Sequence, residues 1–137
     1  TKKMSKSAAS EKNYISLTDS TDVIHKKIMS AVTDDVGKIN YTADQPGLKN
    51  LIDIYALTSD RTPEEIATEY ADKGYGDLKK DVSASVIGMV APLQTKINEY
   101  LSDEAELIKL IHQGGERANE IANAKMKEIR TAIGVEL

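Results

Sequence analysis

The 137-residue chain contains no cysteine, no tryptophan and no phenylalanine. Without cysteine it can form no disulfide, no thiolate nucleophile and no zinc site of the cysteine type. It has no run of eighteen apolar residues, which excludes an apolar membrane-spanning helix, and no secretory signal pattern at its start. Its content of 40% hydrophobic and 29% charged residues is typical of a folded protein. We therefore expect a cytoplasmic protein that does not bind membranes.

Acidic residues outnumber basic ones by 22 to 18, which gives a net charge of −4. Residues 1–27 nevertheless carry a charge of +3, and the remainder carries −7. Proteins that bind duplex DNA without sequence preference are usually basic, so we expect no DNA partner. An anionic ligand would meet the basic N-terminal segment first. A solvated basic tail would have the same composition, and charge alone does not separate the two readings.

After residue 18, apolar residues recur with a helical period along most of the chain. The period predicts helices at about residues 22–32, 48–56, 63–71, 82–101 and 104–133. Pro92 is expected to bend or split the fourth helix, and Gly74-Tyr75-Gly76 to end the third. The alternation Tyr14-Ile15-Ser16-Leu17 predicts one short extended strand that has no partner strand in this chain. The expected fold is all-α, an irregular bundle of five or six amphipathic helices on one shared core, preceded by a flexible loop and that strand.

Polar residues predict where several of these helices begin. Ser20 lies in a cluster of side chains that can accept hydrogen bonds from the free N–H groups of a first turn. Thr62 is followed three residues later by Glu65, and Asp103 is followed at the same spacing by Glu106. This spacing is the signature of a capping box, in which each side chain bonds to the other residue's backbone N–H.

Few side chains suggest catalysis or metal binding in the helical part. Neither His25 nor His112 has a second histidine three or four residues along the chain, so we predict structural or surface histidines and no metal site. The pair Gly114-Gly115 has no preceding strand and no following Lys-Ser pair, which excludes a phosphate-binding loop of the common type. The paired acids Asp34-Asp35 lie where a helix is expected to end, and nothing in the sequence supports a role for them in general acid–base catalysis.

One segment near the start of the chain differs from the rest. It is Lys3-Met4-Ser5-Lys6-Ser7, in which two lysines alternate with hydroxyl side chains in a stretch without helical or strand pattern. An ammonium group on a long stem is a compact donor that can follow a moving negative charge. Serine hydroxyls and successive backbone N–H groups add neutral donors. The segment is therefore suited to binding a polyphosphate.

The same five residues match, letter for letter, the KMSKS signature of class I aminoacyl-tRNA synthetases. The sequence that follows resembles the bacterial tryptophanyl branch of that class over nearly the whole chain. The segments that carry the resemblance include residues 23–28, Ala31-Val32-Thr33-Asp34, residues 47–51, Tyr75-Gly76-Asp77-Leu78-Lys79 and residues 116–134. One departure is Ala8-Ala9-Ser10, where the family often has Asp-Asp-Asn or Asp-Pro-Asn. It replaces acidic and amide groups by small residues and leaves both lysines in place.

The resemblance implies an enzyme that uses ATP, with Mg²⁺, to attach tryptophan to its tRNA. Residues 1–18 would be the KMSKS loop and the end of the catalytic nucleotide-binding domain, and residues 19–137 a helical anticodon-binding region. Lys3 and Lys6 would be catalytic, stabilising the departing pyrophosphate. These two, together with Met4, Ser5 and Ser7, would bind ATP. The full-length enzyme is expected to be a homodimer with ATP and tRNA as its partners.

The nucleotide-binding domain and the His-Ile-Gly-His motif lie upstream in that family and are absent from these residues. We therefore expect this chain by itself to be inactive. Individual tRNA-binding residues are not assigned, because a solvated charged face explains the cations of the last helix equally well. Those cations are Lys109, Arg117, Lys125, Lys127 and Arg130. Two alternatives stay open at this point: a tyrosyl-type synthetase fragment, and a non-enzymatic helical interaction module whose basic head is only a tail.

Overall fold

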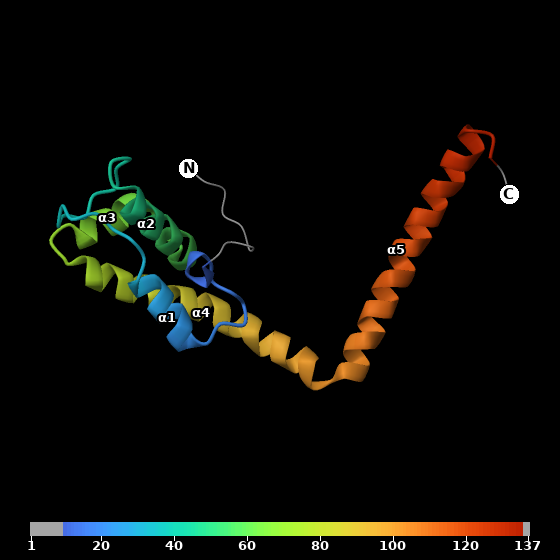
Figure 1. Cartoon of the computed structure of the whole chain (residues 1–137), viewed down its shortest axis with the longest axis horizontal. Coiled ribbons are helices and arrows are strands. Elements are labelled where there is room, and N and C mark those ends of the chain that lie inside the picture. The colour runs from blue at the N-terminus through green and yellow to red at the C-terminus, as the bar shows by residue number, and fades with distance from the viewer. Residues whose placement is uncertain (1–9, 136–137) are drawn as a thin grey trace. The chain divides into compact units, whose positions relative to one another are not determined.

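The computed structural model describes residues 10–135, and within them it is all-α, as the sequence predicts (Figure 1). A short 3-10 helix, η1 (Glu11–Asn13), precedes five α-helices. These are α1 (Thr21–Met29), α2 (Pro46–Ser59), α3 (Pro63–Tyr70), α4 (Tyr75–Ser102) and α5 (Glu104–Ala132). The chain divides into two units, Thr1–Gln94 and Thr95–Leu137, and each is described by itself.

The predicted helix starts are confirmed. The Ser20 hydroxyl accepts a hydrogen bond from the N–H of Val23 at the start of α1. At α3, the Thr62 hydroxyl accepts from the N–H of Glu65 while the Glu65 carboxylate accepts from the N–H of Thr62, which completes the capping box. Asp103 accepts from the N–H of Glu106 at 3.0 Å and begins α5. Local sequence therefore determines these starts.

Two predicted helix limits differ from the structure. Helix α1 ends at Met29 rather than near Val32. The ammonium of Lys79 in α4 donates hydrogen bonds to the carbonyl oxygens of Met29 and Ala31. In a longer helix, backbone N–H groups of the next turn would bind these oxygens. Helix α4 begins at Tyr75, inside the segment predicted to be a stop. It also continues through Pro92 as one helix, so of the bend or split expected at Pro92, the split does not occur.

Residues 14–17 form no paired strand, and no strand occurs among residues 10–135, in agreement with the expectation that this segment has no partner strand in the chain. A strand needs a neighbouring strand to complete its hydrogen bonds. Side chains satisfy this backbone instead. The N–H of Ser16 donates to the Asp19 carboxylate at 2.8 Å, and the carbonyl of Leu17 accepts from the amide of Gln94 at 3.0 Å.

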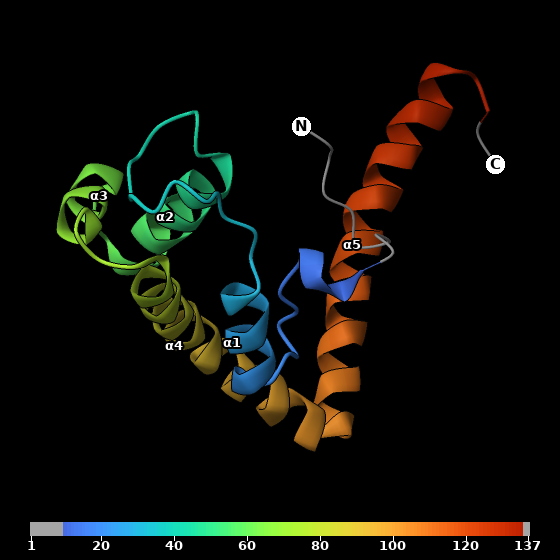
Figure 2. The same cartoon turned by 60° about the vertical axis from the view of Figure 1, so that its left-hand side comes forward.

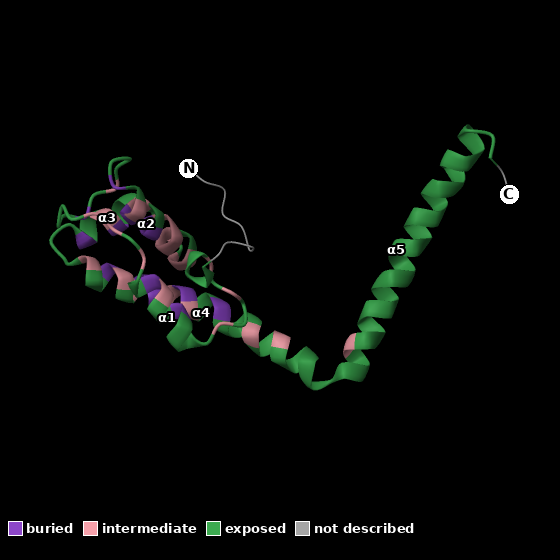
Figure 3. Ribbon diagram, viewed as in Figure 1, coloured by how far each residue is buried: buried purple, intermediate pink, exposed green. Residues whose placement is uncertain are grey.

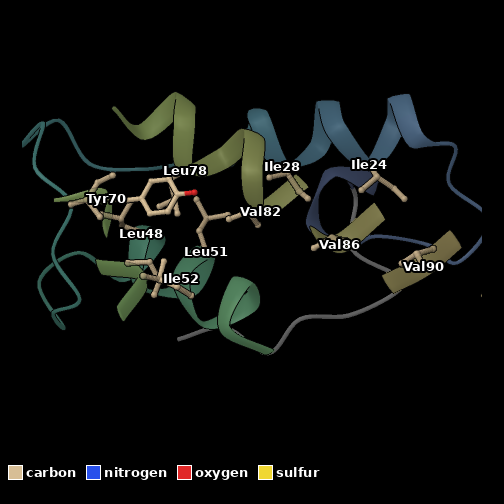
Figure 4. Close-up of a cluster of buried hydrophobic side chains, with 12 residues drawn as sticks. Ile24, Ile28, Leu48, Leu51, Ile52, Tyr70, Leu78, Val82, Val86 and Val90 are labelled. Atoms are coloured by element: carbon tan, nitrogen blue, oxygen red, sulfur yellow. The ribbon is translucent and has the colours of Figure 1, made fainter. Parts of the chain in front are cut away.

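The core of the first unit is built from one face of each of four helices (Figure 4). In α4 the buried residues Leu78, Val82, Val86 and Val90 are spaced four apart and form one stripe. Each such side chain removed from water contributes roughly 1.5–3 kcal/mol. The other buried apolar residues are Ile24, Ile28, Ile39, Leu48, Leu51, Ile52, Ile66 and Tyr70. Hydrogen bonds between His25 and Ser83 and between Thr58 and Ser85 also join α1 and α2 to α4.

The second unit consists of residues 95–137 and contains the end of α4 and helix α5. No residue from Glu104 to Ala132 is buried (Figure 3). All the buried apolar residues of the described chain lie before residue 95, so the predicted core shared by every helix is wrong for α5. No helix in the described part of the chain is both long and apolar enough to cross a membrane.

Candidate functional site

The residues that carry the predicted phosphate chemistry lie outside the described range. They are Lys3, Met4, Ser5, Lys6 and Ser7. The described structure begins at Ser10, whose hydroxyl accepts a hydrogen bond from the N–H of Lys12 at 3.3 Å and caps η1. Ser10 is the last residue of the departure at positions 8–10. The serine at position 10 therefore supplies a capping oxygen three residues after the end of the motif.

Residues 14–20, here called the strap, connect η1 to α1 (Figure 2). Asp19 of the strap forms an ion pair with Lys27 of α1 at 2.6 Å, with both side chains mostly buried. The Lys27 ammonium holds the pKa of the Asp19 carboxyl below its usual range. From α4, the side-chain amide of Gln94 donates to the carbonyl of Asp19 at 2.7 Å and to that of Leu17. The segment that follows the motif is thus fixed to two helices.

Residues 30–45 form the loop between α1 and α2, and residues from two other helices hold its first part. Lys79 of α4 donates from Nζ to the carbonyl of Ala31 at 2.7 Å. Gly47 of α2 approaches so closely that a Cβ added to it would lie 2.3 Å from the carbonyl oxygen of Val32. Only glycine fits this position without a shift of the backbone.

Asp34 is the centre of a polar cluster in the same loop. Its Oδ1 accepts hydrogen bonds from the Tyr75 hydroxyl at 2.5 Å, from the Gln45 amide at 3.1 Å and from the N–H of Val36 at 3.0 Å. The Tyr75 hydroxyl in turn accepts from the N–H of Gly37. These donors lower the pKa of the Asp34 carboxyl, and the Tyr75 hydroxyl has the largest effect. The Asp34 carboxylate in turn raises the pKa of Tyr75.

Three of the segments that carry the resemblance therefore meet at one loop, namely residues 31–34, 47–51 and 75–79. The groups that meet there are one ammonium, one glycine, one carboxylate and one phenol. Their contacts run between α4, α2 and the loop, so the arrangement braces the loop. The outer face of that loop leaves Val32 86% exposed.

Comparison with known proteins places the chain in a family. Residues 1–91 match the model of the family described as tRNA synthetases class I (W and Y). The chain belongs to this family. The matched range covers both the KMSKS motif and all the elements that brace the α1–α2 loop.

Among curated proteins, the chain is similar to tryptophan–tRNA ligases of bacteria. It is 40% identical over 134 residues to the ligase of Clostridium perfringens, which covers 98% of this chain and 40% of that protein. It is 41% identical over 136 residues to the ligase of Enterococcus faecalis, with coverage of 98% and 40%. The chain thus spans about two fifths of the length of these relatives.

The fold of this synthetase-family chain also matches a solved structure. The crystal structure of tryptophanyl-tRNA synthetase from Mycoplasma pneumoniae superimposes with a TM-score of 0.83 at 23% sequence identity. The match covers 98% of this chain and 41% of that one. At this level of identity, the likeness concerns the fold.

The cations of α5 are all exposed in the structure. Lys109 pairs with Glu106 at 3.2 Å, and Lys125 with Glu128 at 2.6 Å. Arg117, Lys127 and Arg130 form no ion pair with any described residue.

The two histidines occupy different environments. His25 shares a hydrogen bond with the buried hydroxyl of Ser83 at 3.0 Å between Nδ1 and Oγ, and His112 lies exposed on α5. Within residues 10–135 no group of three or more metal-ligating side chains lies together. The His25–Ser83 pair joins α1 to α4, and its serine is too deeply buried to attack a substrate.

Sequence reasoning missed three residues that organise this site. Tyr75 was assigned to a helix stop, although it lies in a segment that resembles the family. Gln45 and Gln94 carry no local signal at all, because their partners lie up to 77 residues away in the chain. A buried glutamine such as Gln45 becomes informative only when the groups around it are known.

Proposed function

We propose that this chain is the C-terminal part of a tryptophan–tRNA ligase. In the complete enzyme, the carboxylate of tryptophan attacks the α-phosphate of ATP, which gives tryptophanyl-adenylate and pyrophosphate, and the acyl group then passes to the 3′ end of the tRNA. The observation that carries this proposal is the 40% identity to bacterial tryptophan–tRNA ligases over 98% of the chain. We expect the complete enzyme to be a cytoplasmic homodimer.

In this proposal the KMSKS residues bind the triphosphate during the first step. Lys3 and Lys6 neutralise the charge that develops on the departing pyrophosphate. Met4 packs near the adenosine, and Ser5 and Ser7 donate hydrogen bonds to phosphate oxygens or hold the loop. A donor placed where charge develops is typically worth ~3 kcal/mol to the transition state. Mg²⁺ prefers oxygen ligands, so ammonium groups do not hold it, and it would enter bound to the phosphates of ATP.

The fixed strap supports the same role. Because Gln94 and Lys27 hold residues 17–19, the chain leaves the motif toward a defined place on α1 and α4. A loop tethered at one end loses less conformational entropy when it closes over a ligand. The tether therefore supports the proposed role of the motif in binding the triphosphate.

The variant Lys6→Ala in the full-length ligase tests the catalytic role. We expect the rate of adenylate formation to fall about a hundredfold while the affinity for tryptophan changes little. Lys80→Ala is the matched control, because Lys80 is an exposed lysine of α4 that pairs with no described acid. Equal losses of rate and of affinity would mean that Lys6 serves general binding, and an unchanged rate would remove it from catalysis.

We also propose that the helical part, residues 19–137, binds the anticodon end of the tRNA. The braced α1–α2 loop exposes Val36 and Lys38, and α5 exposes Arg117 and Arg130. Apolar and cationic groups of this kind are suited to unstacked bases and to phosphates. The test is charging of a tryptophan tRNA whose anticodon has been replaced. Charging as efficient as that of the natural tRNA would refute anticodon binding.

The family also includes enzymes for tyrosine, so the amino acid is tested directly. Pyrophosphate exchange is measured with the full-length protein, once with tryptophan and once with tyrosine. Exchange that depends on tryptophan alone is the expected result. Exchange with tyrosine would mean that tyrosine is the substrate. Exchange with neither amino acid would favour the alternative of a non-enzymatic helical interaction module.

A further inference from the structure

Three polar side chains hold the tip of the α1–α2 loop, residues 35–38, and together they are called the tip cluster: Asp34 of the loop, Gln45 just before α2, and Tyr75 of α4. Each bonds to a different backbone group of the tip. The Asp34 carboxylate accepts from the N–H of Val36, and the Tyr75 hydroxyl accepts from the N–H of Gly37, both at 3.0 Å. The Gln45 amide donates to the carbonyl of Lys38 at 2.9 Å. Three successive residues of the tip therefore have a fixed backbone.

The side chains of the tip remain in solvent. Val36 is 63% exposed, and Lys38 is exposed and forms no ion pair with any residue of the described range. Between them, Gly37 turns the backbone at a φ of 75°, a conformation that favours glycine. A fixed backbone that carries an exposed apolar group and an exposed cation is the arrangement of a recognition loop on a rigid scaffold.

The stability of the fold does not account for the tip cluster. The Oδ2 atom of Asp34 is buried and has no hydrogen-bond partner among residues 10–135. A buried polar atom without a partner destabilises a protein, and the tip buries no apolar side chain in compensation. The buried apolar residue of this loop is Ile39, which follows the tip. A loop that only connects two helices needs no such carboxylate, so the cluster requires a functional explanation.

We propose that Asp34, Gln45 and Tyr75 are positioning residues for tRNA: they hold the tip in the conformation in which it meets the anticodon loop. This inference rests on the proposed function. An apolar side chain beside a cation suits an unstacked base and its phosphate, and Val36 and Lys38 supply these two groups. A tip that is already fixed loses less conformational entropy when it binds. The tip cluster therefore acts on the affinity for tRNA and not on the reacting atoms.

Transfer of tryptophan to tRNA by the full-length ligase tests the proposal in a cycle of two enzymes and two tRNAs. The enzymes are the parent and Tyr75→Phe, which lacks the hydroxyl that joins Asp34 to Gly37. The tRNAs are the natural tryptophan tRNA and one with a replaced anticodon. We expect Tyr75→Phe to raise the KM for the natural tRNA about tenfold with little change in kcat. With the replaced anticodon, whose contacts to the tip are already lost, we expect kcat/KM to change by less than about twofold.

A purely structural effect of the substitution would give a different result. A partly unfolded variant would lose the same factor of kcat/KM with both tRNAs, and equal factors would overturn the proposal. An unchanged KM for the natural tRNA would overturn it as well. Tyr41→Phe is the matched control, because the Tyr41 hydroxyl also donates to a carboxylate, that of Asp53 at 2.6 Å, and bonds to no backbone group of the tip. We expect Tyr41→Phe to charge both tRNAs as the parent does, and a selective loss in this control would overturn the proposal.

Gln45→Met is the second variant, in case Tyr75→Phe disturbs the start of α4. Methionine is similar in length but has no donor, so the carbonyl of Lys38 and the carboxylate of Asp34 both lose their amide partner. We expect the same selective rise of KM, and its absence in a variant that still makes tryptophanyl-adenylate would overturn the proposal.

The parent enzyme separates failure of this inference from failure of the proposed function. If the parent prefers the natural tRNA but both variants lose the same factor with either tRNA, positioning by the tip cluster fails and anticodon binding stands. If the parent charges both tRNAs equally well, anticodon binding fails and the inference fails with it.

Discussion

Replacing Gly47 with alanine would test the close approach that braces the α1–α2 loop. The added Cβ would lie 2.3 Å from the carbonyl oxygen of Val32, and the next nearest atom is the carbonyl carbon of the same residue at 3.3 Å. Real Cβ atoms essentially never come within 3.0 Å of such an atom. The obstacle is backbone, so no side-chain rotation relieves it. Either the loop or the first turn of α2 must move.

The magnitude follows from two opposing effects. Glycine to alanine in a helix normally stabilises by about 0.5–1 kcal/mol, because the unfolded chain of the glycine form has more freedom to lose. Forcing an extra carbon into a packed site costs about 1–3 kcal/mol. The matched control is Gly88→Ala in α4, where an added Cβ meets nothing within 4 Å and only the favourable effect operates. Because the favourable effect operates in both variants, we expect them to differ by the packing cost alone, roughly 1–3 kcal/mol.

Urea unfolding provides the assay. Tyrosine fluorescence reports on the first unit, because five of the six tyrosines precede residue 95. Helical circular dichroism, recorded in parallel, also reports on α5. Gly47→Ala should lower the midpoint of the fluorescence transition, and Gly88→Ala should raise it slightly. If Gly47→Ala unfolds at the same or a higher urea concentration than the parent with an unchanged slope, the close approach to Val32 is absent and the bracing argument fails.

Two further predictions concern the carboxylates of the first unit. In Tyr75→Phe, the pKa of Asp34 should rise toward its ordinary value, because the tyrosine hydroxyl is the main group that lowers it; carboxyl NMR titration measures this, and an unchanged pKa would contradict the cluster. Asp19→Asn should be less stable than the parent at neutral pH. Because the pKa of Asp19 is lower in the folded state than its unfolded value of about 3.9, the ionised carboxylate stabilises the fold above that pH. This stabilisation is lost as the pH falls through the folded-state pKa, so the difference in stability between the parent and Asp19→Asn should vanish in acid. A pH-independent difference would show that Lys27 does not act through charge.

Helix positions and helix starts could be predicted from the sequence because their causes are local. The four-residue spacing from Leu78 to Val90 marks the buried face of α4, and the capping box of α3 needs only residues three apart. The end of α1 could not be predicted, since it depends on an ammonium from Lys79, 48 residues beyond Ala31. Apolar alternation at residues 14–17 indicated a strand, but no partner strand exists among the described residues and Gln94 satisfies the backbone instead.

The candidate site also contains residues that the sequence predicts and residues that only tertiary contacts identify. The KMSKS residues were found because five consecutive letters carry the signal, while the groups that fix the strap and the loop come from separate helices. Gln45 is buried and bonds to Asp34 and to the carbonyl of Lys38, yet its neighbours in sequence give no reason to select it. Tertiary hydrogen bonds of this kind have no periodic signature, so only coordinates reveal them.

The position of the Ala31-Val32-Thr33-Asp34 segment bears on the choice between tryptophan and tyrosine. This segment carried the sequence resemblance to the tryptophanyl branch, and the structure gives its residues structural partners: the Ala31 carbonyl binds Lys79, Val32 contacts Gly47, and Asp34 binds Tyr75. These contacts brace the loop, while Val32 is 86% exposed and Asp34 Oδ2 has no hydrogen-bond partner among the described residues. Shared packing is therefore enough to explain the likeness of this segment to tryptophanyl enzymes, and the likeness does not by itself identify the amino acid. For that reason the pyrophosphate exchange with both amino acids, rather than any variant of this loop, decides the substrate.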